Sequence, residues 1–242
     1  MDSPSWSELA DALTASLELT TPPIAISFGA GLPEGVDRYE GAKPPPASDG
    51  RTGPVPAGCV FWTKAIDRTF STVAGDHANC SVGTLVHGFA RLDALAGNSD
   101  VAALVESGWV SPEQIPDIPT VRERPGSVTY GPLAQTSLTP DVVLVRIRAG
   151  QLMLLAEAVP GLQIGGKPQC RVIALAKEQG QVAASLGCTL SRTRTGLSGD
   201  EITCAIPGPR LVEVVRNVEA TARIDAVAES YAAADIRRFA PT

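Results

Sequence analysis

The spacing of apolar residues along the chain predicts alternating helices and strands. An apolar stripe at helical spacing covers residues 6–17, and the capping box Ser5-x-x-Glu8 marks the start of that helix. Continuous apolar runs predict further strands and helices. The predicted strands are 24–28, 71–74, 127–133, 141–147, 182–186 and 201–206. The predicted helices are 59–70, 80–95, 101–106, 149–159, 170–178, 209–223 and a last helix to about residue 238. We therefore expect an α/β or α+β fold, a mixed sheet with flanking helices, in one domain over residues 1–242.

Two parts of the chain, residues 20–95 and 138–206, show the same order of features. Each reads strand, loop, a cysteine that begins a helix, a short strand and a second cysteine. The two cysteines are 21 residues apart in the first part and 18 residues apart in the second. Duplicated halves would be related by a pseudo-twofold axis, so equivalent cysteines would converge near it. Helices over residues 209–238 follow the second part.

The cysteines of this repeated pattern are Cys59, Cys80, Cys170 and Cys188. Four thiolates at one site suit an iron–sulfur cluster or zinc, because soft ligands select these metals over Mg²⁺ or Ca²⁺. Neither pair has the C-x2-C spacing of a zinc ribbon or a ferredoxin loop, and free cysteine is also common as a small buried residue. Both interpretations stay open on spacing alone. Cys204 lies inside a predicted strand, so we exclude it from the site.

Composition and charge narrow the function classes. The net charge is −6 and the chain has no basic cluster, which argues against a nucleic-acid partner. No apolar run approaches the roughly 18 to 20 residues of a membrane span, and residues 1–4 lack the features of a signal peptide. We therefore expect a cytoplasmic protein without membrane contact. An odd number of cysteines, five, argues against a disulfide framework and favours metal or thiol chemistry.

Polar residues near the cysteines suggest further roles. His77 precedes Cys80 by three residues and, with Asp76, is the candidate acid/base or additional ligand; a loop histidine bonded to Asp76 is the alternative. Asn79, the residue before Cys80, is a polar candidate for binding the substrate.

A second polar segment follows Cys188. Arg192 and Arg194 present two guanidinium groups, which suit a carboxylate or a phosphate. We therefore predict a small anionic molecule as substrate, with a solvated charged loop as the alternative.

Several short motifs occur in the order found in one known family. They are Pro23–Phe28, Gly58-Cys59, Asn79–Gly83 with His87-Gly88-Phe89, Pro140–Val145, Gln169-Cys170, Gly187-Cys188, Asp200–Ile202 and Ile206–Gly208. Together they resemble the uncharacterised family called domain of unknown function 169, or ArCR, over about residues 8 to 218. The resemblance implies that Cys59, Cys80, Cys170 and Cys188 are the family's cysteines, and it implies no reaction.

Three functions follow from these observations. The leading prediction is an enzyme of the lyase, dehydratase or desulfurase type that holds a [4Fe-4S] cluster and uses it as a Lewis acid, with zinc as the alternative metal. The second is an electron-transfer or sensor protein with a closed cluster. The third is a metal-free enzyme in which Cys80, activated by His77, is the nucleophile. The alanine-rich helices also predict a homodimer.

Overall fold

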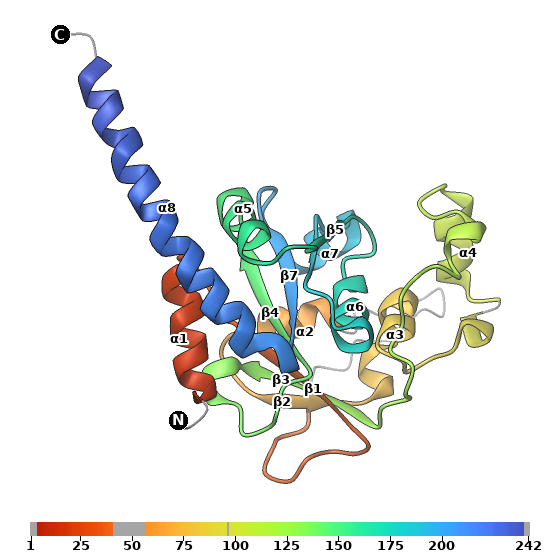
Figure 1. The fold of residues 1–242 in the computed structure, drawn as a ribbon. Coiled ribbons are helices and arrows are strands. Elements are labelled where there is room, and N and C mark those ends of the chain that lie inside the picture. Colours follow the sequence, from red (N-terminus) through yellow and green to blue (C-terminus); the bar gives the residue numbers. More distant parts are fainter. Residues whose placement is uncertain (1–3, 41–56, 96, 240–242) are drawn as a thin grey trace.

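The computed structural model describes residues 4–40, 57–95 and 97–239 and contains one seven-stranded sheet with helices on both faces (Figure 1). The strands are β1 (Ile24–Gly29), β2 (Phe70–Thr72), β3 (Ser127–Pro132), β4 (Val142–Ile147), β5 (Gln163–Gly165), β6 (Ala183–Ser185) and β7 (Ile202–Pro207). The helices are α1 (Trp6–Ser16), α2 (Gly58–Lys64), α3 (Ser81–Val86), α4 (Ser99–Glu106), α5 (Ala149–Ala158), α6 (Arg171–Gln179), α7 (Thr189–Thr195) and α8 (Leu211–Phe239). The predicted α/β fold with a mixed sheet is confirmed, because β5 and β6 pair in parallel and the other strands pair antiparallel.

Alternating side chains of the strands build two cores, one on each face of the sheet. In β4, Val143 and Val145 join the core under α1, α5 and α8, whereas Val142 and Leu144 join the core under α2 and α6. Both faces of the central strands are therefore covered, which explains their continuous apolar runs. Cys204 of β7 lies in the first of these cores, on the opposite face from the other four cysteines.

The sheet order β2-β3-β1-β4-β7-β6-β5 repeats one arrangement on the two sides of its centre. Ile24 of β1 pairs with Pro132 of β3, and Val142 of β4 pairs with Pro207 of β7 in the same register. A 3₁₀ helix follows each of these prolines. Since β1 and β4 pair antiparallel, an approximate twofold axis passes between them.

The extent of the repeated arrangement differs from the predicted ranges. The first of the two repeated sets of strands consists of β1, β2 and β3. Strand β3 lies beyond the predicted range 20–95. The described arrangement thus extends the first set to Pro132, because the segment around α4 is inserted before β3. Duplication itself stays a prediction.

The start of α1 agrees with its prediction, whereas the predicted end of α3 does not. The predicted capping box of α1 is confirmed: Glu8 N–H donates to the Ser5 hydroxyl at 3.3 Å, and Ser5 N–H donates to the Glu8 carboxylate at 2.7 Å. The predicted helix 80–95 is wrong in length, because α3 ends at Val86. Gly88 has a φ of +78°, and a Cβ there would lie 2.8 Å from the carbonyl oxygen of Val121.

Three other elements differ from the prediction. The helix predicted over 59–70 ends at Lys64, because Phe70 pairs with Tyr130 of β3 as the first residue of β2. The two helices predicted at the C-terminus are one continuous helix, α8. Strand β5 was not predicted, because its Gln163 and Ile164 are exposed and carry no apolar alternation. Residues 41–56, between β1 and α2, lie outside the described residues.

Helix α8 leaves the body of the molecule as a long arm (Figure 1). Its buried residues, Leu211, Val214, Val215 and Val218, lie in the first turns. No helix in the described part of the chain combines the length and the apolar character needed to cross a membrane.

Candidate functional site

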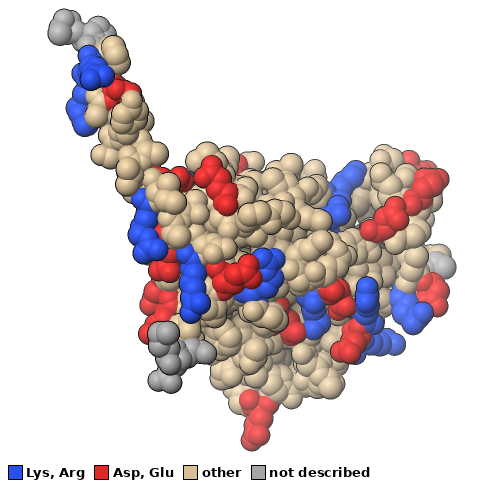
Figure 2. Space-filling view, in the orientation of Figure 1, with Lys and Arg blue, Asp and Glu red and all other residues tan. Residues whose placement is uncertain are grey.

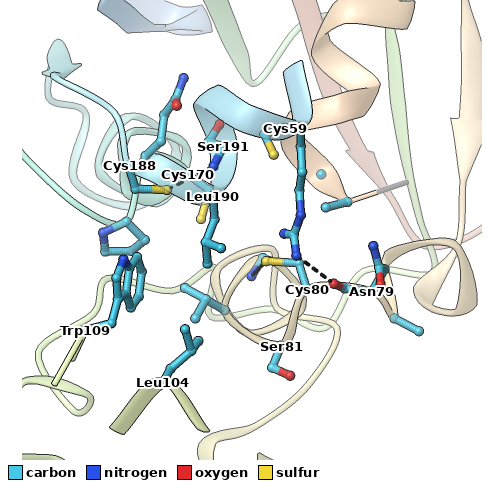
Figure 3. A pocket seen from close by; sticks show the side chains of 18 of the residues that line it. Cys59, Asn79, Cys80, Ser81, Leu104, Trp109, Cys170, Cys188, Leu190 and Ser191 are labelled. Carbon is cyan, nitrogen blue, oxygen red and sulfur yellow. Dashed lines mark hydrogen bonds between the residues drawn. The ribbon is translucent and has the colours of Figure 1, made fainter. Parts of the chain in front are cut away.

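A cavity of about 590 Å³ lies where the first turns of α2, α3, α6 and α7 meet on one face of the sheet. Its lining includes Cys59, Cys80, Cys170 and Cys188, the cysteines of the repeated pattern. Figure 3 shows them together, with Leu104 and Trp109 across the cavity from Cys59. The fold thus brings together four cysteines, the first and last of which are 129 positions apart in the sequence.

Cys80 and Cys188 occupy equivalent positions at the starts of α3 and α7. Each is the N-cap residue of its helix, and each sulfur accepts a backbone N–H from the residue three positions later, Gly83 or Ser191, at 3.4 Å. These bonds explain why both helices begin at a cysteine, because an N-cap side chain satisfies an N–H group that has no partner within the helix. They also orient the two sulfurs in the same way.

Cys59 and Cys170 are more deeply buried, with 8% of each residue exposed. Burial raises the pKa of the Cys59 thiol, and the Ser191 hydroxyl and the Arg194 guanidinium oppose this shift. Burial also raises the pKa of the Cys170 thiol well above its ordinary value, and negative charge on Cys80, Cys59 or Cys188 would raise it further. Both thiols are therefore protonated at neutral pH in the metal-free protein. A metal must displace these protons, so its affinity rises with pH.

Among the described residues, no group of three or more histidine, cysteine, aspartate or glutamate side chains is arranged to hold a metal ion. The four cysteines of the cavity nevertheless form an all-thiol donor set. Thiolates suit zinc or an iron–sulfur cluster rather than Mg²⁺ or Ca²⁺.

Arg194 is the one charged side chain among the described residues that line this cavity. It extends from α7, and its Nη2 donates to the carbonyl oxygen of Asn79 at 3.5 Å, a long bond that leaves most of the guanidinium donors for a ligand. Asn79 also lines the cavity, so the structure brings two of the predicted substrate-binding residues to the cysteines.

Arg192 has a different position. Its guanidinium donates to the carbonyl oxygens of Leu186 and Glu201 at 2.7 and 2.8 Å and also to that of Ser198. These bonds hold the segment around α7, and Arg192 does not line the cavity. We therefore leave it out of the substrate site.

His77 and Asp76 lie beside α2 rather than at the cavity. His77 is fully buried against the rings of Phe61 and Phe89, at centroid distances of 4.8 and 4.7 Å. Its Nε2 is 2.9 Å from the Thr72 hydroxyl, and burial holds its pKa well below the ordinary value. Asp76 accepts the N–H of Val73 at 2.8 Å. Neither residue lines the cavity, so the sequence proximity of His77 to Cys80 does not place the imidazole beside the thiols.

Several residues of the cavity were not selected by sequence reasoning. Trp109 and Leu104 come from the segment around α4, which contains no cysteine that would have indicated them. The ring of Trp109 lies 4.8 Å from the ammonium group of Lys167, which also donates to the Trp109 carbonyl oxygen. The loop before α6 thereby holds Trp109, although its sequence suggests no ligand.

Gln169 was also missed as a site residue. It lines the cavity with 2% of the residue exposed, and its side-chain nitrogen donates to the Thr203 hydroxyl. Its side-chain oxygen has no hydrogen-bond partner in the described part of the protein. A buried polar group without a partner is costly, so this end of the carboxamide is a candidate contact for a ligand.

The fold and the cavity define an α/β protein with a thiol-lined site between two repeated sets of elements. The chain belongs to the uncharacterised ArCR family, domain of unknown function 169, whose family model matches residues 12–217. Comparisons with curated proteins and with solved structures give no match.

Proposed function

We propose that three of the four cysteines Cys59, Cys80, Cys170 and Cys188 hold a [4Fe-4S] cluster with one open iron, and that the protein is an enzyme acting on a small anionic molecule. The observation that carries the proposal is the meeting of these four sulfurs, from four helices, in one cavity. The described residues of the lining include no aspartate or glutamate, so hard metal ions have no preferred ligands among them. Zinc is the alternative metal, because thiolates also bind Zn²⁺.

The remaining lining residues suit a Lewis-acid reaction on an anion. When bound, a cluster with an open iron supplies a Lewis acid for elimination or hydration. Arg194 would bind the negative charge of the substrate, and the N–H groups of Gly83 and Ser191 would stabilise charge on the sulfurs of Cys80 and Cys188. Loss of water from a substrate removes a proton from one carbon and hydroxide from its neighbour. Such a reaction needs no external oxidant or reductant.

A second candidate function rests on the number of cysteines in the cavity. If all four bind, every iron is covered, and the protein is an electron carrier or sensor rather than an enzyme. The third hypothesis, Cys80 activated by His77, has no support in the geometry. His77 Nε2 is hydrogen-bonded to Thr72, and the Cys80 sulfur accepts from Gly83.

The proposal is tested by the absorption spectrum and metal content of anaerobically purified protein. We expect a brown protein with broad absorption near 400 nm and about four irons and four sulfides per chain. Reduction with dithionite should bleach this absorption. A colourless protein with about one zinc per chain would contradict the cluster, as would a metal-free protein that also fails reconstitution with iron and sulfide. The cytoplasmic location stays a prediction; the five free cysteines suit a reducing compartment.

We also propose that the projecting part of α8 pairs with a second copy of the chain. Ile224, Val227 and Tyr231 lie on one face of this helix, and each is about seven-tenths exposed. On the face of the arm seen in Figure 2, charged side chains gather near its two ends, and the sequence between them also carries Asp225 and Glu229. Most of the stability of helices in proteins comes from packing of an apolar face, so burial of this face against another copy would stabilise the arm.

The pairing predicts the mass of the protein in solution. We expect the wild-type chain of 25.1 kDa to sediment as a dimer in analytical ultracentrifugation. The double substitution Val227→Lys and Tyr231→Lys should give a monomer, because two charges would enter the apolar interface. Ala226→Lys, on another face of the same helix, serves as the control and should stay dimeric. A monomeric wild type would refute the pairing.

A further inference from the structure

A second cavity, of about 310 Å³, adjoins the cysteine cavity. Val82, Leu104, Trp109 and Pro168 line both cavities, so only a shared wall of side chains separates them. The cysteine cavity carries the thiols and Arg194 on one side of this wall. The second cavity lies on the other side, between α3, the segment around α4 and the loop before α6.

The second cavity is mainly apolar. Its lining includes Leu85, Val101, Val110, Ile115 and Ile118 in addition to the shared residues. Three charged residues also line it. Lys167 is engaged with the ring and the carbonyl oxygen of Trp109, Asp117 lies among the apolar residues, and the Nε of Arg171 is buried without a hydrogen-bond partner in the described part of the chain. A space with this lining takes up hydrocarbon more readily than a charged or strongly hydrated group.

The two cavities together offer complementary chemistry to one kind of ligand. The single guanidinium of Arg194 balances one negative charge and matches the paired oxygens of a carboxylate. A phosphate monoester carries nearly two charges at neutral pH, and Arg194 is the single cation among the described residues that line the cysteine cavity. The free end of the buried Gln169 carboxamide offers a further polar contact near the head group.

We propose that the two cavities form one binding site for a carboxylate with an extended apolar tail. Arg194 binds the carboxylate in the cysteine cavity, and the tail passes Leu104 and Trp109 into the second cavity. The inference deepens the proposed function, because it names the substrate class for the same cavity. In this arrangement the ligand's carbon atoms that adjoin its carboxylate lie beside the cysteines.

The test is calorimetric titration of the anaerobically purified full-length protein with butanoate, hexanoate and octanoate, and with 1-octanol. Burial of methylene groups predicts that Kd falls roughly tenfold for each two carbons added. Octanoate should bind at least tenfold more tightly than octanol. A Kd that does not depend on chain length would overturn the proposal.

Two pairs of variants separate the head-group contact from the tail contact. Arg194→Met should abolish the preference for octanoate over octanol, whereas Arg194→Lys should keep part of it. Val101→Phe fills the second cavity and should weaken octanoate binding at least tenfold while leaving butanoate unchanged. Ala102→Phe, the exposed neighbour on α4, should bind all ligands as the wild type does. Equal behaviour of Val101→Phe and Ala102→Phe, or an unchanged preference in Arg194→Met, would contradict the site.

Iron and sulfide analysis of the same samples distinguishes this inference from the cluster proposal. Chain-length-dependent binding by a protein without iron would support the carboxylate site and refute the cluster. Iron at about four atoms per chain without chain-length dependence would do the reverse.

Discussion

Replacement of Cys170 by alanine is expected to remove the cluster, lowering iron from about four atoms per chain to less than about one. Cys170 is deeply buried in the cavity that Cys59, Cys80 and Cys188 also line. Loss of this sulfur leaves an iron without a protein ligand, and the described residues of the lining include no carboxylate to replace it. Cys59→Ala should have the same effect, because Cys59 has the equivalent place at the start of α2. Anaerobic absorption spectra with iron analysis provide the measurement, and circular dichroism confirms folding.

Cys204→Ala is the matched control for these substitutions. Cys204 is also fully buried, with its pKa raised to about 12 by burial, but it lies in the core on the other face of the sheet. We expect full iron content and a loss of about 1 kcal/mol of unfolding free energy from the small cavity left behind. If Cys59→Ala and Cys170→Ala kept their iron, the model of converging cysteines would be wrong. A single variant among the four that keeps the cluster would identify a cysteine that does not bind, and would favour the enzyme over the electron carrier.

Acidification of the metal-free protein from pH 7 to pH 5 is expected to remove about 2 kcal/mol of unfolding free energy through His87 alone. His87 is completely buried, and burial lowers its pKa from 6.5 to about 4. The unfolded chain takes up a proton as pH falls through about 6.5, whereas the folded chain does not until about pH 4. The stabilisation is therefore complete above the unfolded value, and is lost as pH falls towards 4. The full loss at the lower limit amounts to about 3 kcal/mol.

His87→Gln tests the assignment, because glutamine stays neutral and its side-chain amide can donate to the Gly83 carbonyl oxygen, which lies 2.7 Å from His87 Nδ1. Urea unfolding at several pH values should show a shallower decline for this variant than for the wild type. His77 adds to the decline in both proteins, since its pKa is also lowered by burial. Parallel declines of the variant and the wild type between pH 7 and pH 5 would exclude His87 as the source.

The candidate cysteines could be selected from the sequence because the chain repeats its local order. Cys59 and Cys170 begin predicted helices after a strand and a loop, and Cys80 and Cys188 each follow the next short strand. Each of these features is local, so it is visible in one stretch of sequence. Helix α7, which begins after Cys188, was not predicted. Exclusion of Cys204 was possible for the same reason, because its strand pattern marks a core position.

Contacts between distant segments could not be predicted in this way. Arg192 and Arg194 are two residues apart and look alike in the sequence, yet one holds three carbonyl oxygens and the other lines the cavity. Adjacent helical positions point in different directions, and what each meets depends on the neighbouring elements. Trp109 was missed because the residue that holds it, Lys167, is 58 positions away.

The sequence by itself determined the class of fold, the start of α1 and the four cysteines, since apolar period, capping residues and repeated order are properties of neighbouring residues. Only the tertiary structure decided that these cysteines share one cavity while His77 lies outside it beside Phe61. It also decided the ends of α2 and α3, where strand pairing at Phe70 and the close approach of Gly88 to Val121 override helical pattern. The reason is physical: a helix start is stabilised by residues within one turn, whereas a cavity and its lining arise from packing between elements that meet only in the folded chain.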